Sequence, residues 1–331
     1  MAFGYIGPEP TNDESANNGR FEIDELNKLV EDGKFAPDAF SCDFLVVAGG
    51  GAGGPGNVCG GGGGGGVISS KNMNGGGSTA DSALTLVPGV EYEVRVGAGG
   101  SNNEYTGHPS VFHNKRAIGG GRGWRNNRAI DSAVGGGGGY APGGWTNYGQ
   151  PILHNLSDAE RTALTGSTSK QGYRGSNTGY ESYNSAGGGG GAGQNGSTTN
   201  SGSNGTNHAF QSSTNQTSSG IGEWHNSNST HYVGAGGGSG ANSNTSGGYG
   251  GGGNGGQNSG NAGDANTGGG GGGRFSSSGY SGGSGAILLK YPDTYTCTAG
   301  TGVTGAEYDE GDGNKTFGIT AGAGTITFSK A

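Results

Sequence analysis

The sequence has few of the side chains from which a conventional protein core is built. Only 28% of its 331 residues are hydrophobic, which is well below the share in an ordinary globular domain. Charged residues are also scarce, at 13% with a formal net charge of −8, whereas disordered chains are typically rich in charge. Nine prolines and the lack of a Gly-X-Y period exclude a collagen helix. The composition therefore fits none of these three common classes.

The sequence also lacks the motifs of catalysis, metal binding and nucleotide binding. Its cysteines, Cys42, Cys59 and Cys297, are odd in number and widely spaced, so they predict neither a disulfide framework nor a zinc site and indicate assembly in a reducing cytoplasm. None of the six histidines has the spacing of paired metal ligands. The segment Gly311–Thr316 resembles a phosphate-binding loop, but Asn314 stands where that loop needs glycine. We therefore predict a protein that is not an enzyme and that binds no metal and no cofactor.

Long apolar segments and an excess of basic residues are missing as well. No run of 18 apolar residues is present, so we expect no membrane insertion. The acidic balance argues against nucleic acid as a partner. The first fifteen residues have neither the basic start nor the apolar stretch of a signal peptide.

Glycine is the residue that the sequence has in excess, with 85 of the 331 positions. A single glycine run is expected to stay a flexible coil, because ordering one residue costs about 1–2 kcal/mol and one hydrogen bond returns only about 0.5–1.5 kcal/mol. Several runs packed side by side as polyproline-II-type helices can instead satisfy their backbone groups laterally. The similar lengths of the runs favour this ordered lattice over a linker. The runs are Gly60–Gly66, Gly135–Gly139, Gly187–Gly191, Gly236–Gly238, Gly250–Gly253 and Gly268–Gly273.

Predicted β-strands stand on both sides of the glycine-rich region. In "VEYEVRV" apolar and polar residues alternate, which predicts a half-buried strand with Val90, Tyr92, Val94 and Val96 on its inner face. A short helix is predicted within Leu156–Gly166, because Ser157 and Glu160 have the spacing of a capping box. Further predicted strands are Phe44–Ala48, the segment Leu84–Gly89 with a turn at Pro88-Gly89, Ser110–Ile118, Gly285–Pro292, and a hairpin-like pair made of Gly311–Thr320 and Gly324–Ser329.

The first 39 residues differ in composition from the rest of the chain. A short amphipathic helix is predicted over Phe21–Asp32, with acidic residues in its first turn and Gly33 at its C-terminal cap. At about three turns it is too short to be stable alone, so we expect it to dock on a partner or on the rest of the chain. Its candidate attachment residues are Phe21, Ile23, Leu26, Leu29 and Val30.

We therefore predict a mostly β and irregular fold, in which β-strands frame a polyglycine-II helix lattice and one short α-helix precedes them. Three regions are expected: an attachment segment at 1–39, a glycine-rich domain with exposed loops at 40–292, and a C-terminal hairpin-like tail at 293–331.

The aromatic residues and one basic cluster lie mainly in the polar segments between glycine runs. Tyr and Trp among Ser, Gly and Asn make a good recognition surface, and they could equally cover the lattice and supply apolar contacts. The basic residues around Trp124 form the one positive patch, which suits an anionic polysaccharide or a solvated surface. The candidate receptor-binding residues are Trp124, Arg125, Arg128, Trp145, Tyr148, Tyr173, Tyr180, Tyr183, Trp224, His225 and Tyr232.

Several segments together resemble a known group of proteins. "DFLVVAGGGAGG", "LTLVPGVEYEVRVGAGG", "ANTGGGGGGRF" and "GGSGAILLKYP" follow one another in the order seen in the glycine-rich domain of tailed-bacteriophage tail-fibre and other virion proteins, especially those of marine phages. The chain is also similar to polyglycine-II fibre-tip adhesins. The stretch "NNGRFEIDELNKLVEDGKF" resembles the short N-terminal segment of such proteins. A long trimeric shaft is absent, so the resemblance implies a tip, an appendage or a decoration.

The resemblance implies a non-enzymatic virion protein, a tail-fibre or adhesin component whose loops recognise host cell-surface glycan during adsorption. The alternative is a decoration or a neck or capsid appendage that binds no receptor. Expected partners are other tail or capsid proteins and host surface polysaccharide, in a possible homotrimer. The expected location is the virion, after assembly in the host bacterial cytoplasm.

Overall fold

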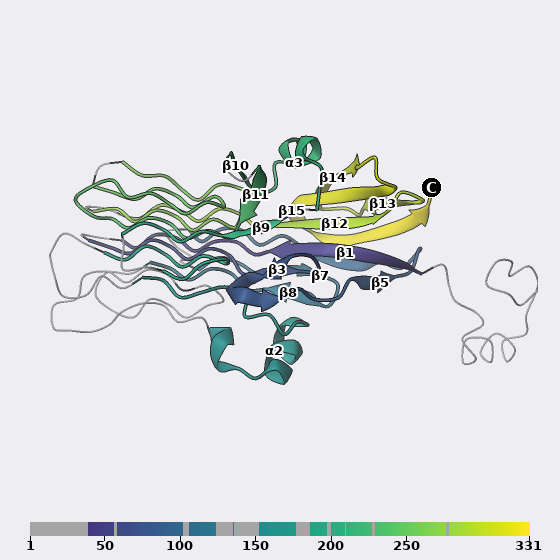
Figure 1. Cartoon of the computed structure of the whole chain (residues 1–331), viewed down its shortest axis with the longest axis horizontal. Coiled ribbons are helices and arrows are strands. Elements are labelled where there is room, and N and C mark those ends of the chain that lie inside the picture. Colours follow the sequence, from purple (N-terminus) through teal and green to yellow (C-terminus); the bar gives the residue numbers. More distant parts are fainter. Residues whose placement is uncertain are drawn as a thin grey trace, which may run out of the picture.

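The structure is a computed structural model that describes residues 39–55, 58–101, 106–123, 135, 152–176, 186–196, 200–208, 210–226, 229–257, 259–275 and 278–331. Two parts follow one another along the long axis of the molecule: a β-sheet at one end and a bundle of extended glycine-rich segments at the other (Figure 1). The predicted helix Phe21–Asp32 and most of the run Gly135–Gly139 lie outside the described residues.

Within the described residues, ten antiparallel strands form the main sheet, whose central path runs β2-β1-β12-β15-β6-β7-β8. Strands β13 and β14 also pair with β15, and β5 pairs with β1. The strands of this sheet are β1 (Phe40–Val47), β2 (Val67–Ser69), β5 (Leu84–Leu86), β6 (Tyr92–Arg95), β7 (Ser110–Phe112), β8 (Lys115–Ala117), β12 (Ala286–Pro292), β13 (Tyr295–Ala299), β14 (Val303–Asp309) and β15 (Asn314–Lys330).

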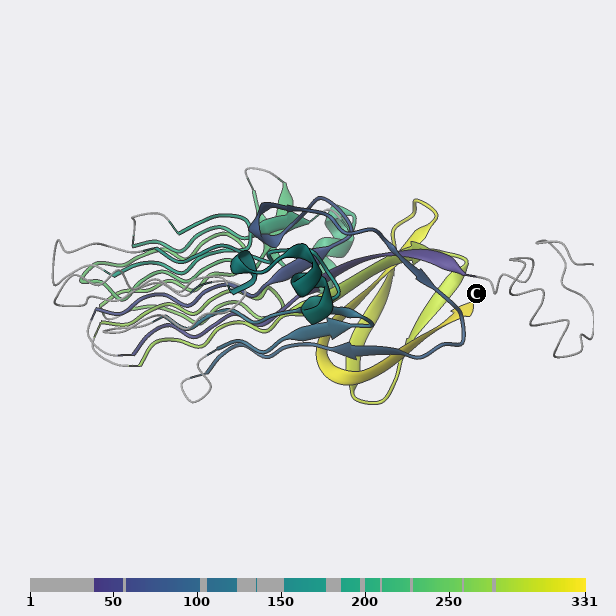
Figure 2. The ribbon, with the colours of Figure 1, turned by 90° about the horizontal axis from the view of Figure 1, so that it is seen from below.

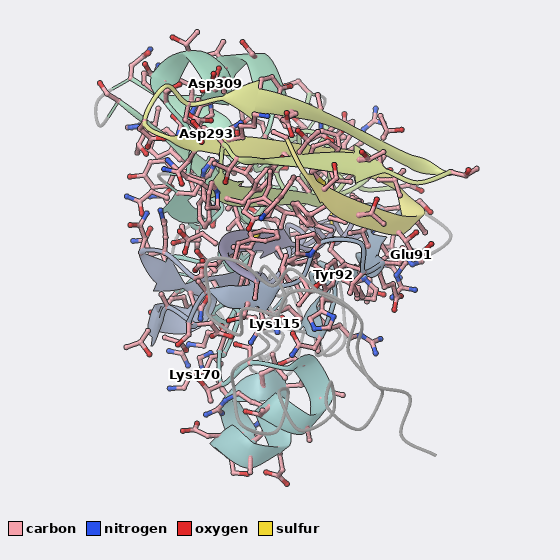
Figure 3. All side chains as sticks on the ribbon, turned by 90° about the vertical axis from the view of Figure 1, so that its right-hand side faces the viewer. Glu91, Tyr92, Lys115, Lys170, Asp293 and Asp309 are labelled. Carbon is pink, nitrogen blue, oxygen red and sulfur yellow. The ribbon has the colours of Figure 1, made fainter. Side chains whose placement is uncertain are left out.

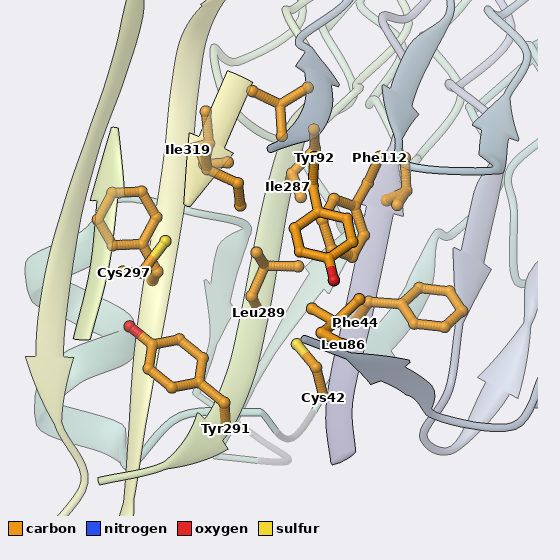
Figure 4. Close-up of a cluster of buried hydrophobic side chains, with 14 of the residues drawn as sticks. Cys42, Phe44, Leu86, Tyr92, Phe112, Ile287, Leu289, Tyr291, Cys297 and Ile319 are labelled. Atoms are coloured by element: carbon orange, nitrogen blue, oxygen red, sulfur yellow. The ribbon is translucent and has the colours of Figure 1, made fainter. Parts of the chain in front are cut away.

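Apolar side chains from opposite ends of the chain make the core of this sheet. Phe44, Phe112, Ile287 and Leu289 are all fully buried in one cluster, together with the nearly buried Tyr291 (Figure 4). Phe44 of β1 pairs with Leu289 of β12, so the first and last apolar runs predicted from the sequence lie side by side. The scarce hydrophobic residues are thus concentrated in one place, where their burial can stabilise a fold.

The predicted alternation in Val90–Val96 is confirmed except at its first residue. Tyr92 and Val94 are buried, Glu93 and Arg95 are exposed, and Val96 packs partly against the core. Val90 is 44% exposed, because it follows the turn at Gly89, which has a positive φ of 79°, and precedes the start of β6.

The predicted hairpin-like pair in the C-terminal tail is wrong. Apart from the turn Gly311–Gly313, both of its segments lie in one 17-residue strand, β15. Its first half pairs with β12 and β14, and its second half pairs with β6 and β13. The chain bends sharply between the two segments, where Gly322 has a positive φ of 100°, but the segments do not pair with each other because each has other strands as partners (Figure 2).

The run Gly60–Gly66, here called the central rod, is ordered as the lattice hypothesis predicts. All seven residues are buried. Successive N–H groups donate to three different neighbouring segments, and each neighbour is met again three residues later, which is the period of a polyproline-II-type helix. The donor–acceptor pairs are Gly61–Gly187 (3.1 Å), Gly62–Gly271 (2.9 Å), Gly63–Gly121 (2.7 Å), Gly64–Gly190 (3.0 Å), Gly65–Gly268 (2.6 Å) and Gly66–Ile118 (2.9 Å).

The close approach of these segments requires glycine. A Cβ atom placed on Gly65 would lie 1.9 Å from the carbonyl oxygen of Ala48, and one on Gly61 would lie 2.0 Å from that of Gly237. Both distances are far below the 3.0 Å that real Cβ atoms respect. Neighbouring backbones therefore occupy the space that side chains would need.

The polar segments between glycine runs also contain regular structure. Helix α2 (Asp158–Thr165) has the predicted capping box, in which Ser157 accepts from the Glu160 N–H and Glu160 accepts from the Ser157 N–H. The polar segment 194–233 contains β9 (Thr206–His208), α3 (Ser213–Ser219), β10 (Glu223–His225) and β11 (Thr230–Val233). The remaining short elements are β3 (Met73–Asn74), β4 (Ser78–Thr79) and the 3-10 turns Gly75–Gly77 and Ile152–Asn155.

Candidate functional site

Three of the predicted receptor-binding residues lie on a small sheet beside the junction of the lattice and the main sheet (Figure 1). Its strand order is β10-β11-β9, and all pairs are antiparallel. Val233 of this sheet packs in a buried cluster with Leu288 of β12. This apolar contact fixes the small sheet on the flank of the molecule.

One side of the small sheet carries three aromatic rings, His225, Tyr232 and Tyr249, which we call the aromatic face. The His225 ring centroid lies 3.9 Å from that of Tyr249 and 5.8 Å from that of Tyr232. Tyr249 is 49% exposed, and His225 and Tyr232 are partly exposed. The rings therefore form one contiguous surface that a ligand can reach.

Glu223 of β10 joins the aromatic face to the lattice. Its carboxylate accepts hydrogen bonds from the N–H groups of Gly250 (2.7 Å) and Gly251 (2.8 Å), directly after Tyr249. Hydrogen bonds to a carboxylate are among the stronger ones in proteins, so the backbone that directly follows Tyr249 is held in position. Burial and the nearby Glu223 carboxylate raise the pKa of Asp264, whose N–H donates to the Gly251 carbonyl.

The other side of the small sheet carries Trp224, because adjacent residues of a strand point to opposite faces. Trp224 is 39% exposed, its ring centroid lies 5.1 Å from that of His231, and its indole N–H donates to Asn226 Oδ1 at 2.7 Å. Trp224 is therefore close to the aromatic face in the chain but is separated from it by the sheet.

Beneath Trp224, His231 and His208 form a buried histidine pair with ring centroids 5.9 Å apart. His231 Nδ1 lies 2.9 Å from Gln216 Oε1, whereas neither ring nitrogen of His208 has a hydrogen-bond partner among the described residues. Burial, with a smaller effect from His231, lowers the pKa of His208 to about 4. Both effects keep His208 neutral at neutral pH.

Tyr173 lies apart from these residues. Its ring centroid is 6.1 Å from that of His154. Its hydroxyl oxygen lies 2.4 Å from the position that a Cβ atom on Gly77 would take. The ring is partly buried and lies beside the two 3-10 turns Gly75–Gly77 and Ile152–Asn155. The other predicted receptor-binding residues, Trp124, Arg125, Arg128, Trp145, Tyr148, Tyr180 and Tyr183, lie outside the described residues, as do the attachment residues Phe21, Ile23, Leu26, Leu29 and Val30.

Sequence analysis missed Tyr249 and Glu223. Tyr249 interrupts a glycine run in "SGGYGGGG", and a lone aromatic residue in such a run is a signal that could have been noticed. Glu223 has no such signal, because its role depends on the folding of β10 against Gly250 and Gly251.

The part of the chain that the structure describes contains neither a candidate metal centre nor a membrane-spanning helix. No group of three or more His, Cys, Asp or Glu side chains there could hold a metal ion. No helix among the same residues is long and apolar enough to cross a membrane. All three cysteines are buried free thiols, and burial raises the pKa of Cys59 to about 12, so its unreactive thiol form is favoured.

Comparison with known proteins gives one match. No curated protein and no solved structure matches the chain. The model of the family described as "Glycine-rich domain" matches residues 32–292, which include the central rod, the small sheet and all strands from β1 to β12. The chain therefore belongs to the glycine-rich domain family.

Proposed function

We propose that this protein is a structural component of a phage virion, a tail-fibre or adhesin component that displays surfaces for recognition of host cell-surface glycan. The single observation that carries the proposal is the exposed aromatic face, which is held on a lattice of backbone segments. The resemblance to phage glycine-rich proteins supports the virion location and the other virion proteins as partners.

The two ends of the described chain fit attachment at the sheet end of the molecule. Phe40, at the start of β1, stacks on Tyr295 with ring centroids 4.2 Å apart, and Tyr295 pairs with Lys330 near the C-terminus. Both ends of the described chain therefore meet at the sheet end, away from the lattice (Figures 1 and 2). In the proposal, residues 1–39 attach the protein to the virion from this end.

The surface of the sheet end exposes charged side chains of both signs, among them Glu91 and Lys330. Figure 3 looks onto this end, where Glu91, Asp293 and Asp309 are exposed carboxylates. Such a surface is poorly suited to stacking on sugar rings. The aromatic face combines three rings with a phenol hydroxyl and an imidazole, which can stack on a sugar and hydrogen-bond to its hydroxyl groups.

The proposal is tested with bacterial surface polysaccharides immobilised as an array and with Tyr249→Ala in the full chain. Tyr249 is half exposed, so its removal is expected to leave stability nearly unchanged and to weaken binding about tenfold. Leu164→Ala is the matched control, since Leu164 is a similarly exposed apolar side chain, 45% accessible, on α2.

Loss of binding in Tyr249→Ala with retention in Leu164→Ala supports the proposal. Binding that Tyr249→Ala leaves unchanged contradicts the role of the aromatic face. A protein that binds no polysaccharide and no cell surface but is incorporated into virions contradicts the adhesin function and supports the alternative, a decoration or a neck or capsid appendage.

A further inference from the structure

A pocket of about 250 Å³ lies in the lattice away from the aromatic face. Its polar lining consists of amide and hydroxyl side chains, and no charged side chain lines it among the described residues. The polar lining residues are Asn244, Thr245, Ser246, Asn254, Ser259 and Asn261.

Backbone pairing places this pocket at the end of the lattice remote from the sheet. The central rod enters β2 at Val67, so its other end, next to Cys59, is the remote one. Cys59 forms a bridge with Gly240, and the Arg274 N–H donates to the Cys59 sulfur. Arg274 in turn forms a bridge with Gly256, beside the pocket.

The three asparagines of the pocket are held by their side-chain oxygens. Asn254 Oδ1 accepts from the Gly247 N–H at 2.9 Å, and Asn261 Oδ1 accepts from the Asn254 N–H at 2.8 Å. Asn244 Oδ1 accepts from the Ser259 hydroxyl at 2.9 Å. No hydrogen bond among the described residues involves the side-chain nitrogens of these three asparagines. All three residues are exposed, so a ligand can reach these nitrogens. Each amide therefore keeps two N–H donors for a ligand while its orientation is fixed.

An aromatic ring lies against one wall of the pocket. A Cβ on Gly260, which lines the pocket, would lie 2.6 Å from Cε2 of Tyr280. The guanidinium of Arg274 lies 5.8 Å from the centre of the same ring. This cation–π contact helps to hold the ring in place, and the glycine allows it to approach the pocket.

We propose that this pocket is a binding site for a neutral saccharide unit. Fixed amide donors and hydroxyl groups match the hydroxyl groups of a sugar, and a pocket without charged side chains offers no opposite charge to an anion or a metal ion. The site shares no residue with the aromatic face. The inference does not depend on the virion location or on the binding function of that face.

The experiment is ligand-observed NMR and calorimetric titration of the full chain with methyl glucoside, methyl galactoside, methyl mannoside and N-acetylglucosamine at millimolar concentrations. The test variant is Asn254→Asp, which keeps the oxygen that accepts from Gly247 but replaces the N–H donors by a second, charged oxygen. The matched control is Asn242→Asp, which adds the same charge at an exposed residue that does not line the pocket.

We expect at least one of these saccharides to bind the wild type, with affinity about tenfold lower in Asn254→Asp and unchanged in Asn242→Asp. No binding of any of the four overturns the proposal, and so does binding that Asn254→Asp leaves intact or that both variants lose equally. Tyr249→Ala, with its pocket intact, is expected to bind the saccharide normally. Failure of the aromatic face and failure of the pocket are therefore distinguishable.

Discussion

The lattice and the main sheet bury their backbones in opposite ways. In the central rod, Gly62 and Gly65 donate to Gly271 and Gly268, and no side chain takes part. In the main sheet, Phe44 and Leu289 meet across paired strands and fill the space between them with side-chain atoms. The lattice consequently has no room for an added atom, whereas the sheet loses stability when atoms are removed. The two parts should respond differently to substitution.

The largest effect is expected for Gly65→Ala in the central rod. The new Cβ would overlap the Ala48 carbonyl oxygen, and a buried backbone cannot shift without breaking several hydrogen bonds. We expect a loss above about 4 kcal/mol, or failure to fold, as measured by urea unfolding and circular dichroism.

Gly313→Ala is the control for this substitution. Gly313 has a φ of 78° and open space around its Cβ position, so only the strain of a positive φ applies, about 1–2 kcal/mol. Equal losses in the two variants would contradict close packing in the lattice.

In the main sheet, Phe44→Ala is expected to reduce the free energy of unfolding by about 3–5 kcal/mol, because it leaves a cavity where a fully buried ring had been. The measurement is the urea unfolding midpoint together with its slope. Val90→Ala, at a residue 44% exposed, should change stability by less than about 0.5 kcal/mol. A Phe44→Ala effect as small as that of Val90→Ala would contradict this placement of the core.

Low pH should destabilise the small sheet, because His208 is buried there and becomes protonated as the pH falls. Its pKa is about 4 in the folded protein and about 6.5 when unfolded, so the unfolded state binds the proton first as pH falls. The stability contributed by the neutral form is complete above pH 6.5 and is lost progressively towards pH 4, by about 3 kcal/mol at 1.36 kcal/mol per pKa unit. Burial lowers the pKa of His231 in the same direction.

The measurement is the free energy of unfolding from pH 7 to pH 4 in the wild type and in His208→Leu. The variant should lose less stability than the wild type over this range. The same pH dependence in both proteins would mean that His208 is already accessible to protons in the folded state.

The smallest effect is expected for Ser157→Ala at the N-terminus of α2. The substitution removes the hydroxyl that accepts from the Glu160 N–H and should lower stability by about 1 kcal/mol. Thermal unfolding followed by circular dichroism would detect this change, and an unchanged midpoint would show that α2 contributes little to the cooperative unit.

The sequence predicts local features of both parts better than their long-range partners. The capping box at Ser157 and the alternation from Tyr92 to Val96 depend on neighbouring residues only, and the structure confirms both. The central rod is recognisable because seven successive glycines have no side chains to pack. They can be buried only where backbone packs against backbone. The hairpin-like tail was mispredicted because its two segments pair with other strands, the first with β12 and β14 and the second with β6 and β13, and not with each other.

The candidate sites depend even more on such partners. Trp224, His225 and Tyr232 are noticeable as aromatic residues, but their division between two faces follows from the register of β10 and β11. Tyr249 joins His225 only after the lattice has folded back on itself. The asparagine pocket is invisible in the sequence, because Asn244, Asn254 and Asn261 are three among many asparagines.

Hydrogen exchange at the central rod tests the ordered lattice most directly. Amide protons of Gly61–Gly66 should exchange as slowly as those of Phe44–Val47 in β1, because both sets are buried and hydrogen-bonded. Exchange at the central rod as fast as that of the exposed turn Gly311–Gly313 would contradict the lattice and would support a flexible linker instead.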